Sequence, residues 1–275
     1  MSESNALGFK VLKPGMLTLI QDLGRFGCHN IGLTTGGPLD PNAFNWANKL
    51  CSNSSNTSCL EVTVGGLELE VQLDTTFCVT GAKLPLTVNG KSKPQWQSLS
   101  VFKGDIIKLG FACEGMRAYL AVSGGFNIKP TFDSVSTVVR EGIGGVDGDK
   151  VLQGQILPFS ASNTAQHNRL VNTPSYKKDV TLRVLLGYQH NAFTELQKRV
   201  FFSSKYTVSE SCDRMGYRLK GAKTKPSING ILSEGICLGA IQVPADGQPI
   251  VLMNDRQTIG GYPKIGSVLS LDLGM

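Results

Sequence analysis

Three short stretches of the sequence combine charged side chains with glycine. They read QDLGRFG at positions 21–27, SCDRMGYRLKG at 211–221 and NDRQTIGGYP at 254–263. An arginine guanidinium can hold a carboxylate or a phosphate through two parallel hydrogen bonds, and an aspartate can accept from a substrate N–H or act as a base. Glycine lets backbone amides approach an anion closely. The three stretches are therefore candidate walls of a site for a small polar amide or acid.

Each stretch also has a purely structural interpretation. Neighbouring Asp and Arg residues are often exposed ion pairs worth less than ~1 kcal/mol, and glycines after strands usually form turns. Tyrosines such as Tyr217 and Tyr262 commonly pack with the hydroxyl at a hydrated edge. The histidines His29, His167 and His190 lie in unrelated sequence contexts, so a histidine-based mechanism is not expected.

The elements that must position these residues are mostly strands. Short β-type runs separated by glycine-containing turns indicate a mainly β fold of the barrel or sandwich kind. The runs are 67–71, 77–80, 98–102, 105–109, 117–122, 182–186, 236–243 and 267–271. Asn-Gly pairs at 89–90 and 229–230 predict two tight hairpins, because this dipeptide suits the positive φ angles of such turns.

Two stretches have helical periodicity. In LDPNAFNWANKL (39–50), Asp40 can cap the first turn, Pro41 suits its first position, and Ala43, Phe44, Ala47 and Leu50 share one face. In HNAFTELQKRVFF (190–202), Phe193, Leu196 and Val200 repeat that spacing. Each half of the chain is thus expected to hold about one helix.

The polar stretch 158–179, rich in Ser, Asn and Thr, is the best candidate for a domain boundary. It predicts a first domain over residues 8–165 and a second over 178–275.

Composition excludes several classes of protein. The formal net charge is +6, but the basic residues are scattered, so nucleic-acid binding is not expected. The seven cysteines form no C-x-x-C pair and no metal-ligand spacing, so we expect reduced thiols, a cytoplasmic location and no metal. No apolar run approaches the ~20 residues of a membrane span, and no signal peptide is recognisable. GIGGVDGDK (142–150) comes nearest to a P-loop but lacks its spacing and terminal hydroxyl.

Taken together, these stretches resemble one family. Five further stretches carry the same resemblance: GGPLD (36–40), WANKL (46–50), LEVTVGG (60–66), YLAVSGGF (119–126) and GAIQVPADGQPIVLMNDRQTIGGYPKIG (239–266). The family is allophanate hydrolase subunit 2, also known as the C-type subunit of 5-oxoprolinase or the biotin-dependent carboxyltransferase domain. The resemblance runs from about residue 11 to residue 275, and its last block is the most specific.

The resemblance implies two cyclophilin-like β-barrel units in tandem. It also implies a partner of related fold, the B-type subunit of 5-oxoprolinase, and a lactam-utilisation protein, the A-type subunit. The reaction implied is the ATP-dependent opening of 5-oxo-L-proline to L-glutamate, with ATP bound by the assembled complex. In urea amidolyase a similar domain transfers a carboxyl group from carboxybiotin to urea, so biotin enters only under that alternative.

Both reactions require fixed donors to the oxygen of a small amide and acceptors for its N–H. On this basis Arg214 and Arg256 are expected to bind the substrate oxygen or an anion, and Asp213 or Asp255 to accept from the N–H. These four are the catalytic candidates. The substrate-binding candidates are Gln21, Asp22, Arg25, Tyr217, Gln257, Thr258, Gly260, Gly261 and Tyr262.

The sequence departs from the family pattern at two positions. Val135 stands where members commonly carry an arginine within Ser-x-Ser-Thr, and Asp149 stands where they commonly carry the arginine of Gly-Arg-x-Leu. If those arginines bind an anion, this chain has altered substrate choice or lost activity. If they brace loops, Lys150 is a candidate to compensate.

Three hypotheses therefore stand. The first is a 5-oxoprolinase subunit, the second is a carboxyltransferase acting on urea or allophanate-type amides, and the third is a non-catalytic regulatory subunit that binds a partner protein. The absence of the two family arginines gives weight to the third hypothesis.

Overall fold

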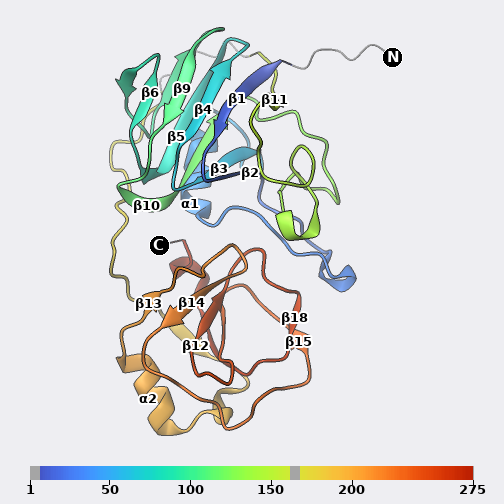
Figure 1. Cartoon of the computed structure of the whole chain (residues 1–275), viewed down its shortest axis with the longest axis vertical. Coiled ribbons are helices and arrows are strands. Elements are labelled where there is room, and N and C mark those ends of the chain that lie inside the picture. The colour runs from blue at the N-terminus through green and yellow to red at the C-terminus, as the bar shows by residue number, and fades with distance from the viewer. Residues whose placement is uncertain (1–6, 162–167, 275) are drawn as a thin grey trace. The chain divides into compact units, whose positions relative to one another are not determined.

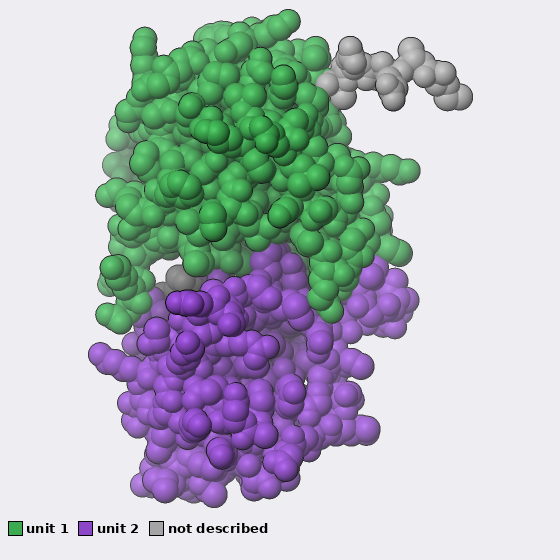
Figure 2. All heavy atoms as spheres, viewed as in Figure 1, with its two compact units in different colours: residues 1–25, 36–179 green, residues 26–35, 180–275 purple. Residues whose placement is uncertain are grey.

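The computed structural model describes residues 7–161 and 168–274. The chain divides into two compact units (Figure 2). Unit 1 comprises Met1–Arg25 and Gly36–Asp179, and unit 2 comprises Phe26–Thr35 and Val180–Met275. Whether each unit folds as a separate domain with the bounds given above stays a prediction, and His167 lies outside the described residues.

Unit 1 is built on two antiparallel sheets with the strand orders β11-β1-β4-β9-β6-β7 and β2-β3-β10-β5-β8 (Figure 1). Apolar side chains from both sheets, among them Phe9, Leu69, Leu60 and Phe77, form one fully buried core. The bounds of the strands are β1 Gly8–Pro14, β2 Leu17–Gln21, β3 Cys59–Thr63, β4 Leu67–Val71, β5 Thr75–Lys83, β6 Leu86–Val88, β7 Lys91–Lys93, β8 Ser98–Val101, β9 Ile106–Leu109, β10 Glu114–Val122 and β11 Ile156–Pro158.

The first helix, α1 (Pro41–Leu50), is confirmed. The side chain of Asp40 accepts a hydrogen bond from the Ala43 amide at 2.9 Å, and the proline occupies the first turn. The apolar face of α1 is buried against a second cluster that includes Cys78 and Tyr119 of β5 and β10. Burial of this face, rather than helix propensity, is the main source of the stability of so short a helix.

Unit 2 has smaller elements. Its main sheet has the order β12-β19-β16-β17-β14-β13, and β15 pairs with β18 (Figure 1). A small core forms around Ile236, Ala240 and Leu252. The bounds are β12 Val184–Leu186, α2 Glu195–Ser203, β13 Thr207–Val208, β14 Gly216–Lys220, β15 Glu234–Gly235, β16 Ala240–Gln242, β17 Ile250–Leu252, β18 Ile259–Gly260 and β19 Lys264–Val268.

The described residues are therefore mainly β, with two α-helices, four short 3₁₀ helices and several antiparallel sheets, as the spacing of the short runs predicts. The finer assignment to cyclophilin-like barrels stays a prediction. No helix in the ranges 7–161 and 168–274 is long and apolar enough to span a membrane.

One of the two predicted hairpins is confirmed and the other is wrong. Asn89 and Gly90 connect β6 to β7 with φ angles of 52° and 75°, as a tight turn requires. No strand pair flanks Asn229-Gly230, because the chain on either side bonds elsewhere: Ser227 donates to Ala192 and Ile231 donates to Gly261.

Helix α2 forms, but its predicted apolar face is wrong. Thr194 and Gln197 make reciprocal capping hydrogen bonds, so the helix begins one residue after Thr194 and leaves the buried Phe193 outside it. Leu196 is 72% exposed, whereas Phe201 is buried. The ring of Phe201 lies 5.7 Å from that of Tyr206, so a contact outside the helix, not the periodicity, accompanies the side that is buried.

The polar stretch 158–179 is partly attached to unit 1. The Tyr176 hydroxyl donates to the Asp40 carboxylate at 2.6 Å, and the Tyr176 amide donates to Glu114 at 2.7 Å. The backbone amide of Leu170 bonds the carbonyl of Trp96. Hydrogen bonding of this kind removes much of the freedom that a polar linker would otherwise have.

Asp272 gives unit 2 an acid-dependent stability. Arg183 donates to its carboxylate from Nε at 3.0 Å, from Nη2 at 2.6 Å and from the backbone at 2.8 Å, and these bonds lower the pKa of Asp272 to about 2. Because the pKa in the unfolded chain is about 3.9, this stabilisation is present above about pH 4 and is lost as the pH falls towards about 2. We expect Asp272→Asn to lower the unfolding temperature at pH 7 and to flatten its fall between pH 4 and pH 2, whereas the exposed Asp179→Asn changes neither. An unfolding temperature of Asp272→Asn equal to that of the unsubstituted chain at pH 7 would contradict the assignment.

Candidate functional site

The two Asp-Arg stretches of unit 2 meet at one end of its main sheet. Strands β14 and β17 are antiparallel, with Gly216 opposite Leu252. The residues that precede β14 therefore lie beside those that follow β17. This register brings the backbone amide of Asp255 to within 2.9 Å of the carbonyl of Arg214.

Arg214 and Asp255 form a buried, two-pronged ion pair. Nε of Arg214 donates to Oδ2 of Asp255 at 2.8 Å, and Nη2 donates to Oδ1 at 2.9 Å. The two residues are 5% and 6% exposed. Such a pair fixes the relative orientation of the two side chains, because the guanidinium and carboxylate planes must align for both hydrogen bonds to form. It fixes the start of the segment 255–258 against β14.

Arg256 fixes the other side of the same segment. Its Nε donates to the carbonyl of Ile236 at 3.1 Å, and the amide of Ile236 donates to the carbonyl of Thr258 at 3.1 Å. Burial lowers the pKa of the Arg256 guanidinium from its usual value. The segment 255–258 is thus held between β14 and the chain around Ile236.

The open side chains of the segment 255–258 are polar, and beyond it the apolar Ile259 is 58% exposed. Gln257 is exposed, Thr258 is half-buried, and Tyr262 is 47% exposed. Gly260 in β18 lies close to its neighbours, because a Cβ there would require the ends of the Ile236 and Gln242 side chains to shift. Gly261 accepts a hydrogen bond from the Ile231 amide. The two glycines therefore let the chain turn closely against β15 and its neighbours.

Asp213 and Tyr217 flank this cluster. Oδ1 of Asp213 accepts from the amides of Met215 at 2.8 Å and Gly216 at 3.1 Å, which holds the turn before β14. Its Oδ2 forms no hydrogen bond within the described part of the chain. Tyr217 lies in β14 and is half-buried. Asp213 is thus the acidic candidate that keeps an oxygen available to a ligand.

The first-half candidates Gln21, Asp22 and Arg25 lie together in unit 1 and are all nearly inaccessible to solvent. The Asp22 carboxylate accepts four hydrogen bonds, from the Ser134 hydroxyl at 2.6 Å, the Ser136 hydroxyl at 2.7 Å, the Val135 amide at 2.8 Å and the Gly24 amide at 2.9 Å. A carboxylate used so fully by its own chain acts as a brace for the segment 134–136.

Gln21 and Arg25 brace the same segment. Gln21 donates to the carbonyl of Thr137 at 3.0 Å and accepts from the amide of Gly37 at 3.0 Å. Arg25 donates to the carbonyls of Thr131 and Ser136, each at 3.1 Å. The three side chains thus position residues 131–137, and their predicted role in contacting a substrate stays a prediction.

Comparison with known proteins decides the family. The family model described as "Carboxyltransferase domain, subdomain A and B" matches residues 31–275. The chain belongs to this carboxyltransferase domain family.

Two relatives bear the name of the C-type subunit of 5-oxoprolinase. The protein from Haemophilus influenzae is 37% identical over 93% of this chain and 82% of its own length. The protein from Escherichia coli is 35% identical over 96% of this chain and 85% of its own length. Among solved structures, the Kluyveromyces lactis urea amidolyase superposes with a TM-score of 0.90 at 26% identity, covering 99% of this chain and 18% of that chain.

Within this carboxyltransferase domain the two departures from the family pattern have simple environments. Val135 is partly buried and packs against the main core of unit 1. Asp149 is exposed, and its Oδ1 accepts from the amide of Lys150 at 2.7 Å. The side chain of Lys150 forms no ion pair within residues 7–161 and 168–274. Compensation by Lys150 therefore has no contact to support it.

The structure also shows a polar cluster around Lys264 and Glu234 that was not predicted from the sequence. Lys264 of β19 forms an ion pair with Glu234 of β15, which lowers the pKa of Glu234. Gln189 also donates to Glu234, at 2.9 Å. Gln242, 6% exposed, is opposite Lys264 in the pairing of β16 with β19. Lys264 lies near the end of the most specific motif, but only the strand register reveals its neighbours.

Proposed function

We propose that this chain is a subunit of an ATP-dependent 5-oxoprolinase that opens 5-oxo-L-proline to L-glutamate in the cytoplasm. The observation that carries the proposal is the similarity to two C-type subunits of 5-oxoprolinase over more than nine-tenths of the chain. The proposal includes two cyclophilin-like β-barrel units, a related-fold partner that is the B-type subunit, and the A-type subunit. ATP is held by the assembled complex without a P-loop in this chain.

Lactam opening breaks the C–N bond of an amide and adds water across it. Negative charge develops on the carbonyl oxygen and must meet fixed donors. In unit 2, the exposed Gln257 and the half-buried Thr258 offer an amide and a hydroxyl donor, and Oδ2 of Asp213 offers an acceptor for the lactam N–H. We assign these groups, with Tyr262, to substrate contact.

Arg214, Asp255 and Arg256 contribute by positioning the segment 255–258 rather than by contacting the substrate. All three residues are buried; Arg214 and Asp255 bond each other, and Nε and Nη1 of Arg256 donate to backbone carbonyls. They hold the segment 255–258 in one conformation, so that its outward side chains need no reorganisation when substrate binds. We propose this role as an alternative to direct binding of the substrate by both arginines, which stays a prediction.

The experiment that tests the function is reconstitution. The chain is co-expressed with its A-type and B-type partners, and glutamate release from 5-oxo-L-proline is followed with and without ATP. ATP-dependent release that requires this chain supports the proposal. An intact complex without release would favour the regulatory hypothesis.

The conservative variant Arg256→Lys separates position from charge. Lysine keeps the positive charge but cannot donate from a planar fork, so the two carbonyl contacts of the guanidinium are not both reproduced. We expect turnover of the complex to fall by about tenfold or more, with a loss of unfolding free energy of about 1 kcal/mol. The matched control is the exposed Arg218→Lys in β14. Unchanged turnover of the Arg256→Lys complex would contradict the assignment.

Carboxyl transfer to a urea-like amide is the second candidate. The observation that favours it is the TM-score of 0.90 with the Kluyveromyces lactis urea amidolyase. Under this alternative the biotin is carried by another protein. Transfer of labelled bicarbonate to urea in the presence of ATP, a biotin carboxylase and a biotinylated carrier tests it directly.

A further inference from the structure

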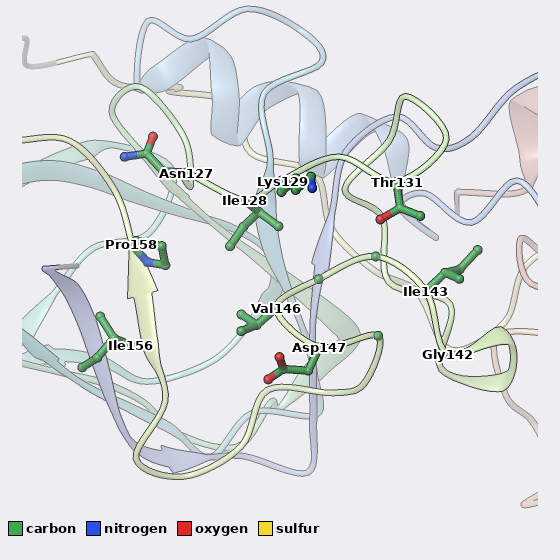
Figure 3. A pocket seen from close by; sticks show the side chains of 13 residues that line it. Asn127, Ile128, Lys129, Thr131, Gly142, Ile143, Val146, Asp147, Ile156 and Pro158 are labelled. Atoms are coloured by element: carbon green, nitrogen blue, oxygen red, sulfur yellow. The ribbon is translucent and has the colours of Figure 1, made fainter. Parts of the chain in front are cut away.

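Unit 1 contains a pocket of about 480 Å³ (Figure 3). One wall is the segment from Asn127 to Thr131, a second is the glycine-rich loop 142–148, and a third is formed by Ile156 and Pro158 of β11. A volume of this size suits a small organic molecule. All of its lining residues belong to unit 1.

The glycine-rich loop is held rigidly by its own packing. Gly144, Gly145 and Gly148 have φ angles of 75°, 58° and 73°, and a Cβ on any of them would collide with neighbouring atoms. Those of the first two would meet Ser136 and Thr137, respectively. The loop therefore rests on the segment that Gln21, Asp22 and Arg25 brace. The pocket wall is preformed, which reduces the ordering cost of binding.

The polar groups of the pocket have both signs. Lys129 is exposed on the first wall, and Asp147 stands on the loop with its Oδ2 accepting from Gln155 at 3.1 Å. The backbone N–H groups of Val146 and Asp147 donate to no atom in the part of the chain that is described. Ile128 lies beside Lys129 and Val146 beside Asp147, whereas Ile156 lies to one side, near Pro158 (Figure 3).

We propose that this pocket binds a small carboxylic acid that also carries an N–H donor, of the amino-acid class. The carboxylate is bound by the Lys129 ammonium and the amides of Val146 and Asp147. The N–H group is bound by the Asp147 carboxylate, whose position Gln155 maintains, and the methylene groups lie on Ile128 and Ile156. This site is additional to the proposed contacts of unit 2; the choice of L-glutamate and 5-oxo-L-proline as probes, and their reading as product and substrate, rest on the proposed function.

Calorimetric titration of the full chain tests the proposal with L-glutamate, 5-oxo-L-proline and succinate as probes. We expect a dissociation constant of about 0.1–1 mM for one of the first two and about tenfold weaker binding of succinate, which lacks the N–H group. Glutamate as the tighter ligand identifies a product or regulatory site, and 5-oxo-L-proline identifies a substrate site. Succinate binding equal to that of the tighter ligand would overturn the role of Asp147, and no binding of either amino-acid probe at about 10 mM would overturn the proposal.

Variants place the binding in this pocket. Gly142 lines it with a φ of 63° and open space around its Cβ position, so Gly142→Asn can keep the backbone conformation while adding a side chain to the pocket lining. The control is Gly90→Asn, which has a φ of 75°, the same open space and a place in a distant hairpin turn. We expect the first to weaken binding about tenfold or more and the second to leave it unchanged. Equal affinities of the two variants would overturn the proposal.

The charge of Lys129 is tested in the same titration. Lys129→Gln is expected to weaken binding about tenfold, whereas Lys150→Gln, an exposed lysine outside the lining, leaves it unchanged. Because Lys129 is exposed and takes no part in the core, folding of this variant is expected to be normal, as thermal unfolding will verify. Unchanged affinity of Lys129→Gln would overturn its assignment as the carboxylate partner.

Discussion

Replacing Asp255 by alanine is expected to lower the free energy of unfolding of unit 2 by about 3–5 kcal/mol. The variant leaves the Arg214 guanidinium buried without the carboxylate that takes two of its hydrogen bonds. Removing one partner of a buried ion pair costs more than the pair itself is worth, because the remaining charge stays desolvated. Hydrogen exchange of the amides in β14 and β17 will measure the loss within unit 2.

The matched control for this prediction removes both charges. In the double variant Arg214→Met with Asp255→Leu, no buried charge remains from this pair, and we expect most of the stability to return relative to either single variant. Stability of Asp255→Ala within about 0.5 kcal/mol of the unsubstituted chain, together with lost turnover of the complex, would instead mean that Asp255 acts on the substrate itself.

Replacing Asp22 by alanine is expected to lower the free energy of unfolding of unit 1 by about 3 kcal/mol or more. Four donors lose their acceptor at once, and hydrogen bonds to a charged group are worth about 1.5–3 kcal/mol each. Both tryptophans, Trp46 and Trp96, lie in unit 1, so their fluorescence during urea unfolding reports this unit.

Two further variants distinguish a brace from a ligand contact at Asp22. Ser134→Ala removes one of the four donors to Asp22 and also the acceptor of the Ser136 amide, and is expected to cost about 1–2 kcal/mol; Asp22→Asn is expected to lie between it and Asp22→Ala. Because the same segment supports the glycine-rich loop, the Asp22→Ala chain is also expected to bind the pocket's ligand more weakly. Asp22→Ala with unchanged stability would contradict the role as a brace and restore the prediction that Asp22 faces a substrate.

Local signals predicted local structure well. Asp40 and Pro41 mark the start of α1, and the predicted run 67–71 is β4 residue for residue. The Asn89-Gly90 pair forms the expected turn. For α1 and the turn, the hydrogen bonds or φ angles that decide the structure involve residues close in the sequence. The partners of β4 are the remote strands β1 and β9, but its own alternation of apolar and polar residues is a local signal.

Where the competing contacts were remote, the same signals were insufficient. The run 236–243 is a strand only from Ala240 to Gln242, since the Ile236 amide bonds the carbonyl of Thr258 instead. The Asn229-Gly230 pair finds no facing strands because Ile231 pairs with Gly261. In α2, Phe201 is buried and Leu196 is exposed, although the helical spacing predicts Leu196 on the buried face.

By itself, the sequence determined the mainly β class, both helices, the capping of α1 and the residue types of the candidate site. It also carried the resemblance to the carboxyltransferase domain family, since a long motif is a property of order along the chain. Only the tertiary structure decided which group each charge binds. Arg214 meets Asp255 across 41 positions, and Asp22 meets Ser136 across 114. The stretches that looked like open charges are thus largely internal braces, because burying a charge is tolerable only when distant parts of the chain supply its partners.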